Sequence, residues 1–246
     1  MKIWLLILVS IVAAINVWAA QETDKSKTIF VLIDFSESAK DARRDYLEAL
    51  NKVLPALRIG DRFIVWKITE KSEMEPKPLL DEDFPYPPPS PNEFYRKQAL
   101  AKAQKQMMET REKIKSKMEA LLNSTVPLSP RTSILSSLQV AERVFKQNKT
   151  RKPVLLILSD MIEDSTDYDF SKEKLSEKRI SQIIEVEKSK KGLPDLNGVK
   201  VYVAGAMAPT RDQFGNIRNF WLRYFKECAA ICPKENYGSA LISFNE

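Results

Sequence analysis

The sequence predicts an α/β protein, built as a doubly wound, mostly parallel sheet with helices on both faces. Continuous apolar runs of strand length, at 29–33 and 154–158, indicate strands that are buried on both sides. Stretches with helical spacing of apolar residues alternate with the predicted strands, which is the pattern of βαβ units. With 246 residues, of which 43% are hydrophobic, the chain is long enough for one sizeable domain.

The predicted elements follow one another along the chain. Beyond the two apolar runs, strands are expected at 62–68, at 199–204 and, closing the sheet, at 240–244. Helices are expected at 39–54, 133–145, 172–188 and 217–230. The last helix carries an aromatic stripe that includes Phe220, Trp221 and Tyr224, and such helical spacing favours a core position over a binding face.

An insertion at residues 72–126 divides the domain into 20–71 and 127–246. Half of the 14 prolines lie in 76–91, so this part is expected to be an extended arm. Residues 92–122 contain no Gly or Pro and predict a long helix, in which Leu100, Met107, Ile114 and Leu121 recur every seven residues. Because this seam is incomplete, the helix either packs on its own domain or docks on a partner.

The first residues have the layout of an export signal. A basic start, an apolar segment and the sequence Val17-Trp18-Ala19 are typical of a cleaved signal peptide, here 1–19. An uncleaved membrane anchor is the alternative, because about 18 mostly apolar residues approach the length that crosses a bilayer. Either alternative places the folded part outside the cytoplasm, as a periplasmic or secreted protein or one anchored to the membrane and facing outward.

Export affects how the cysteines and the charge are interpreted. Cys228 and Cys232 are four residues apart and would be neighbours at a helix end, so an oxidising compartment favours a disulfide. Two free thiols, with Cys228 in the core, are the alternative.

The formal net charge of +6 does not indicate a nucleic-acid partner, because an exported protein rarely meets nucleic acid. Anionic surfaces of the cell envelope fit better, and a solvated surface without function fits best.

Short oxygen-bearing side chains gather where the predicted strands end. Asp34, Ser36 and Ser38 follow the first apolar run, and Asp160 follows the run at 154–158. Between them, Thr132 stands at the start of a predicted helix. Ligands gather at the carboxyl ends of strands in such sheets, and hydroxyl and carboxylate oxygens suit hard cations. Alone, Asp-x-Ser-x-Ser also fits an ordinary turn; the three loops together predict a metal site.

This ordered set resembles the von Willebrand factor type A family, a Rossmann-like fold with a metal-ion-dependent adhesion site. The resemblance implies that Ser36, Ser38 and Thr132 supply hydroxyl ligands, while Asp34 and Asp160 act directly or through water. Ligation of low charge favours Mg²⁺, with Mn²⁺ or Ca²⁺ as alternatives. It also implies a protein partner that offers a carboxylate to the cation.

Two residues depart from the family pattern. Many members have a small residue before the Thr and Gly after the last Asp, where this chain has Arg131 and Met161. The guanidinium of Arg131 would either repel the cation or help to hold a partner's carboxylate.

Catalysis is not expected. Histidine is absent, which excludes Ser-His-Asp catalysis and most zinc enzymes, and the six glycines form no nucleotide-binding loop. A metal-dependent phosphoester hydrolase using Asp34, Asp160, Glu163 and Asp164 is the weaker alternative; Glu163 and Asp164 are expected in a solvated turn or as caps of the segment after them. The second alternative is a scaffold protein of the same fold that binds no metal. The sequence therefore favours an exported, metal-dependent protein-binding module.

Overall fold

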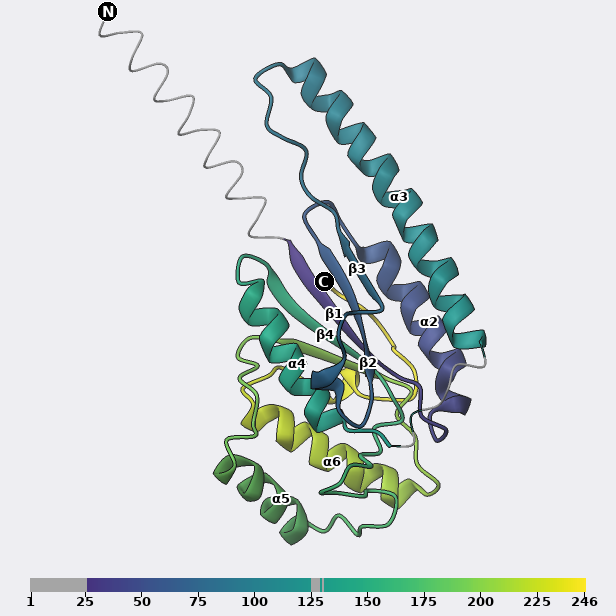
Figure 1. Cartoon of the computed structure of the whole chain (residues 1–246), viewed down its shortest axis with the longest axis vertical. Helices are drawn as coiled ribbons and strands as arrows, with labels where there is room; N and C mark the ends of the chain where they lie inside the picture. The colour runs from purple at the N-terminus through teal and green to yellow at the C-terminus, as the bar shows by residue number, and fades with distance from the viewer. Residues whose placement is uncertain (1–25, 125–128, 130) are drawn as a thin grey trace, which may run out of the picture.

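The centre of the protein is a five-stranded sheet with strand order β3-β2-β1-β4-β5 (Figure 1). The computed structural model describes residues 26–124, 129 and 131–246, so the predicted signal peptide lies outside the described residues. The strands are β1 (Lys27–Asp34), β2 (Arg62–Ile68), β3 (Leu80–Asp83), β4 (Lys152–Leu158) and β5 (Lys200–Ala204). All neighbours pair in parallel except β2 and β3. The predicted α/β class is confirmed.

Helices cover both faces of this sheet. They are α2 (Arg43–Val53), α3 (Glu93–Asn123), α4 (Ile134–Gln147), α5 (Glu177–Ser189) and α6 (Arg211–Glu227), with 3₁₀ turns at Lys40–Ala42, Leu54–Ala56, Ser72–Met74 and Lys234–Asn236. Buried side chains of α2 and α3 pack on one face, and those of α4, α5 and α6 pack on the other. None of the helices in the described part of the chain is both long and apolar enough to cross a membrane.

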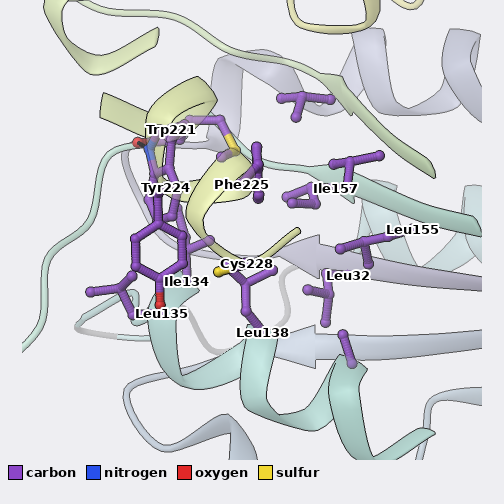
Figure 2. Close-up of a cluster of buried hydrophobic side chains, with 14 of the residues drawn as sticks. Leu32, Ile134, Leu135, Leu138, Leu155, Ile157, Trp221, Tyr224, Phe225 and Cys228 are labelled. Atoms are coloured by element: carbon purple, nitrogen blue, oxygen red, sulfur yellow. Dashed lines mark hydrogen bonds between the residues drawn. The ribbon is translucent and has the colours of Figure 1, made fainter. Parts of the chain in front are cut away.

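The central strand β1 explains why its sequence is apolar without interruption. Phe30 and Leu32 face the α4 and α6 side, while Ile29, Val31 and Ile33 face the α2 side, and all five are fully buried. Figure 2 shows Leu32 and Ile157 in one cluster with Leu138 of α4 and Phe225 of α6. The aromatic stripe of α6 is part of this core, as predicted, because Phe220, Trp221 and Tyr224 are all fully buried.

The proline-rich segment contains a strand that the sequence patterns did not predict. Leu80 to Asp83 lie between Pro78 and Pro85 and form β3, which pairs antiparallel with β2. An edge strand needs backbone hydrogen bonds on one side only, so a short polar segment without proline suffices. Arg62 of β2 also holds Asp81 through two side-chain hydrogen bonds of 2.9 and 2.7 Å. Part of the predicted extended arm therefore belongs to the sheet.

The expected closing strand at 240–244 is absent; this prediction was wrong. The edge of β5 is instead met by isolated bridges, Lys200 with Ile231 and Val203 with Tyr237. The amide of Gly205 donates to the Ser239 carbonyl at 2.7 Å, so the backbone around 237–239 already occupies the edge that a sixth strand would use. Residues 240–246 continue over the α2 side, where Leu241 is buried and Phe244 lies against the Tyr202 ring.

Cys228 and Cys232 are free thiols in the structure, so the expected disulfide is not formed. Helix α6 ends before Cys228, and Ala229 takes a left-handed backbone with φ of 58°. The chain then turns toward the edge of β5 at Ile231 and does not continue the helix. Cys228 stays in the core, which matches the alternative, and burial raises the pKa of both thiols to about 12.

Helix α3 confirms the predicted long helix, but only one of its halves is packed. Ile114, Met118 and Leu122 are buried in the cluster on the α2 side. The first half stands clear of the sheet and extends past the body of the protein (Figure 1). At its other end, Arg43 of α2 donates to the Leu122 carbonyl at 3.4 Å. The C-terminal half of α3 therefore packs on its own domain.

Two methionines of α3 test this division. Met118 is 1% exposed and Met108 is 62% exposed. We expect Met118→Ala to lower the free energy of unfolding by about 3 kcal/mol, because it opens a cavity between α3 and α2. Met108→Ala, the same change on the same helix, should stay within about 0.5 kcal/mol of wild type. Urea denaturation of both variants measures this, and equal losses would contradict the packing of the two halves.

Candidate metal centre

Asp34 joins the loops that follow two neighbouring strands. It is the last residue of β1 and is fully buried. Its Oδ1 accepts a hydrogen bond of 2.8 Å from the Ser36 amide, and its Oδ2 accepts one of 2.9 Å from the Ser159 hydroxyl. Since β1 and β4 lie side by side, with Ile33 opposite Leu158, the residues after both strands meet at the same edge of the sheet.

The two serines of the first loop form a pair of hydroxyl groups. The Ser36 and Ser38 Oγ atoms are 3.1 Å apart. Ser36 is 5% exposed, whereas Ser38 is exposed to solvent. The predicted hydroxyl ligands are therefore neighbours, and the pair reaches from the interior to the surface.

Asp160 is the second carboxylate of the site and carries an unsatisfied atom. Its Oδ1 accepts from the Ile162 amide at 2.8 Å, while Oδ2 is buried and has no hydrogen-bond partner among the described residues. Burial and the nearby charge of Asp34 raise the pKa of Asp160 to about 6, and burial also raises the pKa of Asp34. Two buried carboxylates close enough to repel each other are a place where a cation would be stabilising.

Thr132 is tied by its backbone to the other two loops. Thr132 and Asp164 exchange a pair of N–H to O hydrogen bonds, each 2.9 Å long. On the other side, Ser129 forms a parallel bridge with Ser36. Thr132 is 2% exposed and Arg131 beside it is exposed. The structure thus brings the three loops that carry the five predicted site residues to one end of the sheet.

Glu163 has a role that the sequence patterns did not predict. It is fully buried, and its Oε2 accepts from the Ile134 and Leu135 amides at 2.7 and 3.2 Å, at the start of α4. Burial raises the pKa of Glu163 to about 7. The expected solvated turn is wrong, and this acid caps a helix that precedes it in the chain. In a capping box, an acid three residues after the N-cap would accept from the backbone at the start of the helix, but this chain has Ser136 at that position. The missing acid was the only sign in the sequence that a distant residue caps α4.

Met161 occupies the position at which many members of the resembled family have glycine. Its φ is 67°, in the left-handed region that favours glycine, and its side chain is buried. Two contacts hold this backbone: the Met161 amide donates to the Ser159 hydroxyl at 3.0 Å, and Trp221 Nε1 donates to the Met161 carbonyl at 2.8 Å. The chain makes the same kind of turn with methionine that glycine would make more easily.

The oxygen set determines which ion the site suits. The described residues contain no group of three or more His, Cys, Asp or Glu side chains placed to hold a metal. The candidate site combines two carboxylates with hydroxyl groups, which suits a hard cation that keeps some of its water. A soft metal would lack its preferred sulfur or imidazole ligands here.

Comparisons with known proteins find matches among solved structures. No family model and no curated protein matches the chain. Among solved structures, the chain is similar to the crystal structure of manganese-loaded Plasmodium vivax TRAP protein, with 13% sequence identity and a TM-score of 0.41. The match covers 85% of this chain and 74% of that chain.

The raised pKa of Asp160 predicts a pH dependence of stability. An acid with a folded-state pKa of about 6, above its ordinary 3.8, contributes stability that is complete below about pH 4 and is lost as pH rises through 6. In EDTA, wild type should therefore lose about 2 kcal/mol more between pH 4 and pH 8 than Asp160→Asn, whose amide does not ionise. Denaturation at a series of pH values measures this, and superimposable profiles would contradict it.

Proposed function

We propose that this chain is an exported protein-binding module of the von Willebrand factor type A kind, which captures a carboxylate of a partner protein through a bound divalent cation. The observation that carries the proposal is the buried Oδ2 of Asp160 beside the Asp34 carboxylate. It makes no hydrogen bond of normal geometry with the described residues, although the Ser38 and Ser159 hydroxyls lie near enough to the Asp160 carboxyl to act against the rise of its pKa. An orphaned acceptor in a charged pair costs free energy, and a cation at this place would offset that cost.

The ligand set follows from the contacts of the three loops. Ser36, Ser38 and Thr132 would offer neutral hydroxyl oxygens, and Asp34 and Asp160 would supply the charge directly or through water. Asp34 is already engaged by the Ser36 amide and the Ser159 hydroxyl, which suits it to orient water. We infer Mg²⁺ as the cation, with Mn²⁺ or Ca²⁺ as alternatives, because hydroxyl-rich ligation suits small hard ions.

The partner would approach from the exposed side of the hydroxyl pair. A bound divalent cation supplies an electrophilic centre that a Glu or Asp of the partner can fill. Ser38 lies on the exposed side, and the exposed Arg131 adds a guanidinium beside the same loop. A guanidinium near the cation would favour an acidic partner group and would disfavour a basic one. This arrangement supports binding, and it is why we do not propose catalysis.

Binding of the cation should stabilise the fold. At a Mg²⁺ concentration about a hundred times Kd, the free energy of unfolding should rise by about 2.7 kcal/mol relative to EDTA. Ser36→Ala should lose most of this gain because it removes a ligand hydroxyl. Differential scanning fluorimetry with Mg²⁺, with Mn²⁺ and with EDTA measures the effect.

A matched control lies in the same chain. Asp169, Phe170 and Ser171 repeat the Asp-x-Ser turn, with the Ser171 amide donating to Asp169 Oδ1 at 3.0 Å. This turn is not one of the three site loops, because the backbone of Asp164, which bridges to both Thr132 and Asp169, stands between it and the Thr132 loop. Ser171→Ala should keep the full gain with Mg²⁺. A midpoint that does not differ between Mg²⁺ and EDTA in wild type would favour the metal-free scaffold.

Partner binding should depend on the same residues. From an extract of cell-envelope proteins, the wild-type chain should retain a partner in Mg²⁺ and release it in EDTA, and Asp34→Ala should retain at most about a tenth as much. Ser171→Ala serves again as the control. If Asp34→Ala binds the partner as tightly as wild type, with or without chelator, the proposal fails.

A further inference from the structure

The first half of α3 and the segment before it form an arm, which we define as residues 85–110. The arm joins the rest of the domain at its base, where Arg111 donates a hydrogen bond to the Leu57 carbonyl, Met107 packs partly buried on the core, and Ile114 is the first buried residue of the helix. Asn92 caps the helix at the far end, accepting from the Phe94 and Tyr95 amides at 2.9 and 3.4 Å. Within the arm, α3 is therefore a regular helix up to its tip, although none of its residues before Ile114 is fully buried.

The direction of the arm is fixed by its base. Leu57 belongs to the loop that leads into β2, and the start of β2 pairs with the start of β1, Arg62 with Thr28. Arg111 thus lies level with the end of the sheet at which the parallel strands begin, and Figure 1 shows the arm extending beyond that end. At a rise of about 1.5 Å per residue, Phe94 lies about 25 Å beyond Arg111. The candidate metal centre lies at the opposite end of the sheet.

The tip of the arm is aromatic and basic. Phe94 and Tyr95 are 71% and 60% exposed, and their rings contact each other at a centroid distance of 5.8 Å. Lys97, Lys102 and Lys105 are exposed on the rest of the arm's helix, and residues 93–106 contain four basic residues and one acid. Exposed aromatic rings beside lysines suit the interface of an anionic lipid bilayer, where rings lie at headgroup level and lysines meet lipid charges.

The linker between the apolar N-terminal segment and β1 is short enough for the arm to reach a membrane. Residues 21–26 join the apolar segment that ends at Ala20 to the start of β1, and a fully extended chain over this stretch spans at most about 21 Å. The arm projects about 25 Å from the same end of the sheet. If the apolar segment stays in the bilayer as an uncleaved anchor, the domain is held so close that the tip of the arm reaches the headgroups.

We propose that residues 3–20 stay in the bilayer as an uncleaved anchor and that the tip of the arm binds the anionic surface of the same bilayer, which turns the opposite end of the sheet away from the membrane. The proposal is independent of the metal centre. The lysines attract the anionic headgroups, each changing the affinity about fivefold, and the two rings enter the interface. A second copy of the chain or another helix on the arm is the competing occupant, because the seven-residue seam includes Leu100 and Met107.

The test compares the full chain in two kinds of vesicle. The chain is reconstituted in phosphatidylcholine alone and in an equimolar mixture with phosphatidylglycerol, and amide hydrogen exchange is followed for residues 93–106. Because the anchor inserts in both lipids, a difference reports on the arm alone. We expect slower exchange in the anionic vesicles and loss of that protection when Lys97, Lys102 and Lys105 are all changed to Glu.

The matched control reverses three exposed lysines elsewhere, Lys174→Glu, Lys178→Glu and Lys226→Glu, and should keep the protection. Equal exchange in neutral and anionic vesicles overturns the proposal. Protection that is the same in both lipids and persists in detergent also overturns it, because the arm is then covered by protein. The ion pair of Lys97 with Glu93, at 2.9 Å on the surface, is too weak to account for such changes.

Discussion

The buried carboxylate of Glu163 is the interaction on which the candidate site depends. A fully buried acid is costly, and here two amides at the start of α4 and the Ser133 hydroxyl, 3.3 Å from Oε1, compensate it. The positive end of the helix dipole adds to this compensation. Glu163 follows β4 closely while Ser133 and Ile134 follow the Thr132 loop, so one side chain fixes the two loops to each other. The paired hydrogen bonds of Thr132 and Asp164 form beside this contact.

Unfavourable interactions gather in the same few residues. Asp34 and Asp160 repel each other in a buried place, Asp160 keeps an orphaned oxygen, and Met161 holds a left-handed backbone. Such costs persist only where surrounding contacts over-determine the structure, and they concentrate at functional sites. Trp221 provides one of those contacts by donating to the Met161 carbonyl from a fully buried position in α6. A core residue of α6 thus supports the geometry of a loop that is distant from α6 in the sequence.

The sequence predicts the parts of this protein that local pattern controls. Uninterrupted apolar runs identify β1 and β4 because both of their faces are buried, and the spacing of Asp34, Ser36 and Ser38 identifies the first site loop. Contacts between distant residues leave no such local pattern. The segment Leu80–Asp83 becomes a strand through pairing with β2, and the edge of β5 is occupied by the backbone around Ser239, so 240–244 has no place in the sheet. Glu163 finds its partners about thirty residues earlier, which no local pattern reveals.

The parallel sheet places the candidate metal centre and the arm at its two opposite ends. Because β1, β2 and β4 run in the same direction, loops that follow them meet at one end and segments that lead into them meet at the other. Helix α3 spans this length as one continuous helix: its last turn contacts Arg43, which stands over the Phe35 ring next to Ser36, while its first turn lies beyond the start of β1. A surface that fixes the tip of the arm therefore also fixes the orientation of the Asp34 loop. A single insertion can in this way orient the candidate site from the opposite end of the sheet.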